Sequence, residues 1–223
     1  MKVIHKVVVG SRLHGLANEN SDYDYRGIFV NSLRELSDPF SKRPITHWFE
    51  GDEDNTMYEL GEFCKRASKG ENNSVEILFS NNIVETSEIG KTLVANKEKF
   101  LNSSGIYNAF KGYAHNQLNK MNLFDPDDRT PKFAVAYIRV LLQGTQLLKT
   151  GTMNPQVPDE WKQYLLDVKH EFDVSMIPEL SKKFQELQVE LLQAYANNRN
   201  KYTPDIEWIK EFIYESYKKE VNH

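Results

Sequence analysis

An apolar stretch that ends at a glycine, followed by two closely spaced carboxylates, most constrains this chain. Residues 7–9 are three valines before Gly10, and Asp22 and Asp24 begin a second β-type stretch that runs to residue 30. In an extended strand, residues i and i+2 point to the same face. We therefore expect both carboxylates to face one point, where a cation offsets their mutual repulsion. The sequence predicts two strands, a tight turn and an acidic pair.

The loop after the first strand carries groups that suit phosphate oxygens. Gly10 allows the backbone to turn sharply and to approach a ligand closely. Ser11 and Arg12 supply donors for phosphate, and Arg26 supplies a further cation near the acidic pair. His14 fits a phosphate contact and a plain turn residue equally well. Phosphate donors beside a metal-binding pair favour phosphoryl or nucleotidyl transfer.

The same residues carry a family resemblance. Gly-Ser, a short loop and Asp-x-Asp on the next strand resemble the signature of the DNA polymerase β superfamily of nucleotidyltransferases. The strings GSRLHG and SDYDYRGIFV are similar to its RNA-repair-pathway (RlaP-type) branch, which is widespread in bacteria and phages. The string YELGEFCKRASKGENNSVEILFS and segments in the helical half extend the resemblance from residue 7 to about 155. One departure is Ala136-Tyr137, where a histidine would be expected before the Ile-Arg pair.

The resemblance implies an enzyme that moves a nucleoside monophosphate from an NTP such as ATP to a hydroxyl, releasing pyrophosphate. The acceptor stays open among an RNA end, a protein and a small molecule. Asp22 and Asp24 would bind Mg²⁺ or Mn²⁺. A third carboxylate would complete the site and help to deprotonate the acceptor; Asp54 is the candidate, with Asp52 and Glu59 as alternatives. Gly10 and Ser11 would hold the β- and γ-phosphates, while Arg12 and Arg26 would neutralise developing charge.

Other interpretations of these motifs remain. Asp22 to Gly27 matches the start of a calcium loop, but Arg26 and Leu33 stand where oxygen ligands belong. A solvated acidic turn does not explain why Gly-Ser lies just upstream. The loop lacks the Gly-Lys-Ser/Thr of a nucleotide-binding P-loop. A catalytically silent nucleotide-binding or regulatory module of the same fold is the alternative function.

Composition sets the wider limits. The net charge of −4 excludes a global basic field, so a nucleic-acid substrate would need a local basic patch. The single cysteine, Cys64, excludes an intrachain disulfide and a cysteine-rich zinc site. No apolar run approaches the ~20 residues of a membrane span, so we expect no membrane partner and a cytoplasmic location. The oligomeric state is not predicted.

The hydrophobic pattern predicts an α+β protein. We expect a small mixed-sheet nucleotidyltransferase domain over residues 1–100 and a helical domain over 101–223. Expected strands cover residues 2–9, 22–30 and 55–58; expected helices cover about 58–69, 74–79, 87–100, 107–118, 131–151, 158–172, and two more beginning near Pro178 and Thr203. Residues 31–51 are expected to form a loop with a helical turn, whose Lys42, Arg43 and His47 are candidates for contacting substrate. Tyr113 and Gln117, four apart on a helix, could meet a base or a sugar.

Overall fold

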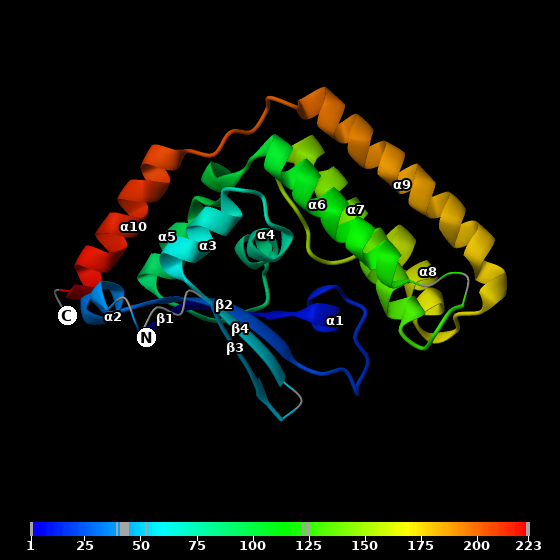
Figure 1. Ribbon diagram of the computed structural model, residues 1–223, viewed down its shortest axis with the longest axis horizontal. Coiled ribbons are helices and arrows are strands. Elements are labelled where there is room, and N and C mark those ends of the chain that lie inside the picture. Colours follow the sequence, from blue (N-terminus) through cyan, green and yellow to red (C-terminus); the bar gives the residue numbers. More distant parts are fainter. Residues whose placement is uncertain are drawn as a thin grey trace.

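The computed structural model describes residues 2–38, 40, 45–51, 53–121, 123 and 125–221, without the side chains of Leu33, Glu220 and Val221. It confirms the α+β class: a five-stranded mixed sheet is followed by helices (Figure 1). Asp52, Lys42 and Arg43, to which the sequence analysis gave candidate roles, lie outside the described residues.

The sheet has the strand order β3-β4-β2-β1-β5. The strands are β1 (Lys2–Val9), β2 (Asp24–Val30), β3 (Ile45–Glu50), β4 (Glu53–Glu59) and β5 (Ile83–Thr86). β2 runs antiparallel to β1 and parallel to β4, while β3 and β5 form antiparallel edges. The centre of the sheet is thus the β1–β2–β4 unit that carries the glycine turn and the acidic pair.

Short helices join or follow the strands, and some of them lie over one face of the sheet (Figure 1). They are α1 (Gly10–Leu13), α2 (Leu33–Ser37), α3 (Leu60–Ala67), α4 (Asn72–Phe79), α5 (Glu88–Ala95) and the 3-10 helix η1 (Lys97–Phe100). Side chains fix several starts: Ser32 forms a capping box with Glu35, and Ser87 accepts from the backbone of Gly90. α4 is almost wholly buried, because it lies between the sheet and the helices that follow.

The second half is helical. It contains α6 (Ser103–Lys120), α7 (Thr130–Thr150), α8 (Asp159–His170), the 3-10 helix η2 (Val174–Met176) and α9 (Ile177–Asn198). α7 packs against α6, α8 and α9 and is the most buried helix of the group. Pro131 stands in its first turn, and Gly151 ends it at φ +75°, as the sequence predicts.

The last helix, α10 (Ile206–Val221), returns to the sheet half. It packs against α3 and η1, away from the α6–α9 group (Figure 1). Tyr217 of α10 donates a hydrogen bond to Glu59, which also caps α3 by accepting from Gly61. One buried apolar cluster runs through both halves, from Ile4 to Phe212. The boundary near residue 100 marks a change in secondary structure, and its status as a domain boundary remains a prediction.

Several elements differ from the expected ones. Residues 45–50 form the edge strand β3 and 83–86 form β5, although both segments are largely exposed and show no clear alternation. The backbone after the glycine turn forms the four-residue helix α1, where a loop was expected. No described helix is both long and apolar enough to cross a membrane.

Candidate active site

The glycine turn lies against the acidic strand. Gly10 has φ +68°, a backbone conformation that residues with a side chain rarely adopt. A Cβ atom there would lie 2.1 Å from Oδ2 of Asp24, so only glycine leaves room for that carboxylate. The contact follows from the register of the sheet, in which Val9 pairs with Asp24. The two motifs of the sequence analysis therefore form one site.

Asp54 lies beside Asp24, because β4 runs parallel to β2 and the two residues are register partners. Burial raises the pKa of Asp24, and the nearby Asp54 and Asp22 carboxylates raise it further. The three acids thus repel one another enough to affect the titration of the central one. Such clustered negative charge favours a cation nearby.

The alternatives to Asp54 are placed differently. Glu59 is at the other end of β4, opposite Phe29, and its carboxylate caps α3 and binds Tyr217. Asp52 is outside the described residues. Asp54 is itself held, because its Oδ1 lies 2.7 Å from Nε2 of His47 on β3. The His47 ring contacts the acidic strand, and its candidate role as a substrate contact remains a prediction.

Arg12 takes a supporting position. Its guanidinium donates to the carbonyl oxygens of Ser21, at 2.6 Å, and Asp22, at 3.3 Å. The same group stacks on the Tyr23 ring, 3.8 Å from the centroid. Arg12 therefore fixes the backbone that leads into Asp22, and its head group does not line the cavity described below. Its expected role as a phosphate contact remains a prediction.

Glu76 on α4 lies close to His14 and Arg26, the two other residues that were expected to contact the nucleotide. Its carboxylate lies 3.3 Å from Nε2 of His14, 3.2 Å from Nη1 of Arg26 and 3.0 Å from Nη1 of Arg139. We call these four residues the Glu76 cluster. Burial alone would raise the pKa of Glu76, but the neighbouring His14, Arg139 and Arg26 lower it. The cluster joins the glycine turn, β2, α4 and α7 with charges that are mostly out of solvent.

His14 is buried and neutral at physiological pH. Burial lowers its pKa to about 4, and the positive charge of Arg139 acts in the same direction. Arg26 and Arg139 already exceed the single negative charge of Glu76, so a third cation there is unfavourable. His14 Nδ1 lies 2.9 Å from the carbonyl oxygen of Pro155. The ring is thus used inside the fold, between α4 and the segment after α7.

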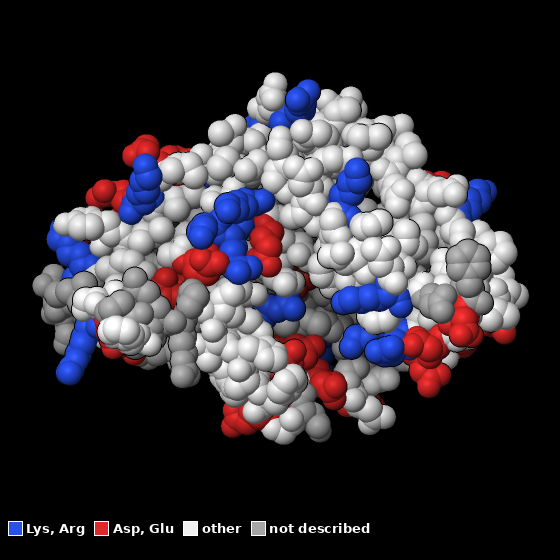
Figure 2. Space-filling model, in the orientation of Figure 1, with Lys and Arg blue, Asp and Glu red and all other residues white. Residues whose placement is uncertain are grey.

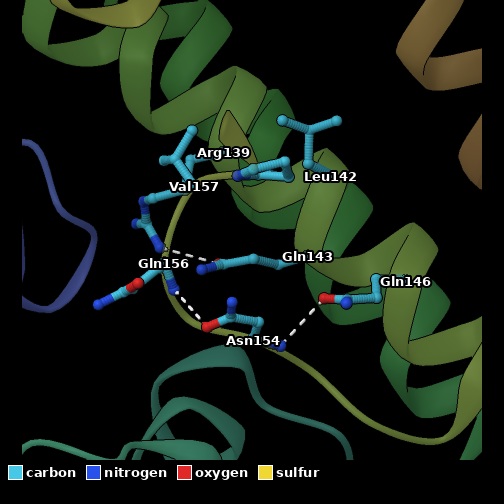
Figure 3. A pocket seen from close by; sticks show the side chains of 8 residues that line it. Arg139, Leu142, Gln143, Gln146, Asn154, Gln156 and Val157 are labelled. Carbon is cyan, nitrogen blue, oxygen red and sulfur yellow. Dashed lines mark hydrogen bonds between the residues drawn. The ribbon is translucent and has the colours of Figure 1, made fainter. Parts of the chain in front are cut away.

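That segment, residues 151–158, is tied to α7 by side-chain amides (Figure 3). Gln146 accepts from the backbone of Asn154 at 3.0 Å, and Gln143 donates to Pro155 at 2.9 Å. Gln143 also accepts from Arg139, which borders both this small hollow, of about 170 Å³, and the main cavity. The segment therefore braces the Glu76 cluster from the helical half.

The main cavity lies between the sheet half and the helical half and measures about 530 Å³. Figure 2 shows the face of the molecule that is seen in Figure 1, and a hollow near its middle has basic and acidic side chains around it. From the sheet half it is lined by Gly10, Ser11, His14, Asp22, Asp24 and Arg26. From the helical half come Tyr113, Asp128, Lys132, Arg139 and Lys169, among others. Gln117, which was expected to share a ligand with Tyr113, is buried and does not line it.

Asp22 and Asp24 fit a divalent cation, although the described residues do not form a complete metal site by themselves. In the described part of the chain, no three His, Cys, Asp or Glu side chains are close enough to hold a metal ion together. Magnesium commonly takes one or two carboxylates, keeps several waters and uses substrate phosphates as further ligands. A carboxylate pair that opens onto a cavity matches this pattern, and the mutual repulsion at Asp24 supports the assignment.

Sequence reasoning missed four residues of the site: Glu76, Arg139, Lys132 and Lys169. Glu76, Lys132 and Arg139 lay in strings that carry the family resemblance, yet nothing local marks a buried ion cluster or a cavity lining. Lys132 and Lys169 come from α7 and α8, and only the packing of these helices brings them to the cavity. Their spacing along the chain gave no signal.

The mixed sheet, the paired carboxylates next to a glycine turn and the cavity lined from the helical half are the features expected of the polymerase-β-like class. The chain belongs to the RNA repair pathway DNA polymerase beta family, RlaP, which matches residues 1–222. No curated protein matches the chain.

Proposed function

We propose that the protein is a Mg²⁺-dependent nucleotidyltransferase that moves a nucleoside monophosphate from an NTP to a hydroxyl group. The observation that carries this proposal is the contact of Gly10 with Asp24, with both Asp22 and Asp24 lining one cavity. An RNA end is the first acceptor to test, because the family description refers to RNA repair. A protein or small-molecule hydroxyl is the next.

The residues of the site would have different roles, which follow from where they lie around the cavity. Asp22 and Asp24 would hold the cation, which supplies Lewis-acid charge for the phosphate oxygens. The backbone at Gly10 and Ser11 borders the same cavity and can approach the phosphates closely. Asp54 lies beside Asp24, on the neighbouring strand β4, and His47 contacts one of its carboxylate oxygens. Its other oxygen is available to take the proton of the acceptor hydroxyl.

In the proposed transfer, each bond that forms is matched by a bond that breaks. The acceptor oxygen forms a bond to the α-phosphorus, the bond to the bridging oxygen breaks, and pyrophosphate leaves with the electron pair. The hydroxyl proton passes to Asp54. The cation would offset the charge that develops on the leaving group, because such charges weigh more in a site shielded from water.

A catalytically silent nucleotide-binding module is the second candidate. One observation favours it: the described residues contain no group of three acids that could hold a metal together. The two functions differ in outcome, because the silent module binds an NTP and leaves it intact.

The test uses purified protein, Mg²⁺, each of the four NTPs labelled at the α-phosphate, and pooled RNA and protein acceptors. The proposal predicts label transfer by the wild type and its loss in Asp22→Ala/Asp24→Ala. Binding without transfer to any acceptor would favour the silent module. Transfer that survives the double substitution would remove these two residues from the mechanism.

A further inference from the structure

The cations around the main cavity are of two kinds. Arg26 and Arg139 both donate to Glu76, and Arg139 is only 11% exposed at its side chain. Their charge is therefore already partly balanced inside the protein. Arg12, the third arginine near the site, binds backbone carbonyls and Tyr23 outside the cavity. The arginines that the sequence offered as phosphate ligands are thus largely committed.

Lys132 and Lys169 are the second kind. Lys132 stands in the first turn of α7 and lines the cavity; among the described residues it has no hydrogen bond or ion pair. Asp22 and Asp24 line the same cavity from the sheet half. Lys132 therefore brings to the cavity of the acidic pair an ammonium group that the described part of the protein does not use.

Lys169 comes from the last turn of α8. Its Nζ donates to the carbonyl oxygen of Leu16 at 2.7 Å, which fixes the ammonium group beside the loop after α1. Burial lowers the pKa of Lys169, and Lys132 lowers it further. Two ammonium groups thus lie close enough to repel each other, and both line the wall opposite the carboxylates. Such a pair is stabilised by a multivalent anion placed between them.

We propose that Lys132, supported by Lys169, binds the β- and γ-phosphates of the NTP, so that the helical half holds the polyphosphate tail. This inference rests on the proposed function. The tail carries the highest negative charge density of the substrate, and it must extend from the cation at Asp22 and Asp24. The only wall with unused positive charge among the described residues is the one formed by α7 and α8. A nucleoside monophosphate would not reach it.

The lysines give the site a means to distinguish chain lengths. A triphosphate spans the cavity from the sheet half to the helical half, whereas a monophosphate meets only the sheet half. Charge-assisted contacts of this kind contribute roughly 1.5–3 kcal/mol each, or about tenfold or more in affinity.

The experiment measures binding by calorimetry, with Mg²⁺ and NTP analogues that carry a methylene group between the α- and β-phosphorus. Each analogue is compared with its monophosphate. The variants are Lys132→Met, which keeps the aliphatic stem, and Lys132→Arg, which keeps the charge. Lys149→Met is the matched control, because Lys149 is exposed on the same helix and does not line the cavity. Thermal unfolding of each variant reports on the fold.

The inference predicts that Lys132→Met weakens the triphosphate about tenfold and leaves the monophosphate within about twofold. Lys132→Arg and Lys149→Met should stay near wild type. Lys169→Met should act in the same direction, with some loss of stability because its bond to Leu16 disappears.

Three results would overturn the inference. Wild-type triphosphate affinity in Lys132→Met would remove the lysine from the tail site and leave the proposed function intact. Equal weakening of mono- and triphosphate would place it at the α-phosphate or the nucleoside. A wild-type protein that binds no NTP in Mg²⁺ would overturn the inference and the proposed function together.

Discussion

Gly10 and Asp24 are in direct contact: a Cβ atom on the glycine would lie 2.1 Å from a carboxylate oxygen of the aspartate. The turn that we propose approaches the phosphates and the acid that we propose binds the cation are therefore one structural unit. Whatever displaces one of them displaces the other. The first prediction follows from this contact.

Gly10→Ala should cost stability and function by separate routes. The φ of +68° costs an alanine roughly 1–2 kcal/mol. The new methyl group must also push the Asp24 carboxylate aside, and a shift of about 1 Å in such a group can cost about 100-fold in rate. Urea unfolding and Mg²⁺-dependent NTP binding measure the two effects.

Gly15→Ala is the matched control for this substitution. Gly15 has φ +71°, but a Cβ atom there meets nothing within 4 Å. It should therefore lose a similar amount of stability and keep NTP binding. Equal loss of binding in both variants would show that the contact with Asp24 has no special role.

Glu76→Gln should destabilise the protein strongly. The substitution leaves Arg26 and Arg139 without their anion in a poorly solvated place, and breaking a buried pair in this way costs about 3–5 kcal/mol. Urea unfolding with an unchanged m-value would measure it. Glu88→Gln removes an exposed carboxylate that pairs with Lys91, and should change stability little, because solvent screens the pair. A similar small effect for both variants would contradict the structural role of the Glu76 cluster.

Stability should fall as the pH is lowered below neutrality. His14 has a pKa near 6.5 when unfolded and about 4 when folded, so between these values the unfolded chain binds the extra proton. Each unit is worth about 1.4 kcal/mol, which gives a loss of about 3 kcal/mol over that window. The lowered pKa of Glu76 adds a further loss once the pH passes below its unfolded value of about 4.5.

Urea unfolding at a series of pH values between 8 and 4 measures this dependence. His14→Gln should reduce the slope between pH 6.5 and pH 4, whatever its effect on stability at pH 8, and leave the part that comes from His5, whose pKa burial also lowers. A wild-type protein whose stability is constant over that range would show that His14 is not buried as a neutral ring.

The sequence predicted the parts of this protein that depend on local pattern. The strand expected at residues 2–9 and the helix expected at residues 131–151 depend on patterns of a few residues, and the structure confirms both, as β1 and α7. The helical turn expected within residues 31–51 is present as α2, where Ser32 and Glu35 form a capping box. The edge strands were missed, since β3 and β5 alternate weakly and owe their form to pairing with β4 and β1.

The candidate site was predictable in the same limited way. Asp22, Asp24 and the glycine turn lie close in sequence, so the sequence alone predicted that they form one site. That Asp54 lies beside Asp24 depends on the parallel register of β2 and β4, which no local pattern gives. The commitment of His14 and Arg26 to Glu76, and the arrival of Lys132 and Lys169, depend on how the helices pack. Ion pairs between residues distant in sequence therefore determine which basic side chains remain available to bind a ligand in the cavity.

The most direct test of the account is whether NTP binding requires both the cation and the acidic pair. Calorimetry would compare the methylene NTP analogues in Mg²⁺ and in EDTA, for the wild type, Asp22→Asn/Asp24→Asn and Asp128→Asn, an acid elsewhere on the same cavity. The account predicts that the wild type and Asp128→Asn bind in Mg²⁺ and lose most of their affinity in EDTA, while the double variant binds weakly in both. Wild-type affinity that persists in EDTA or in the double variant would contradict it.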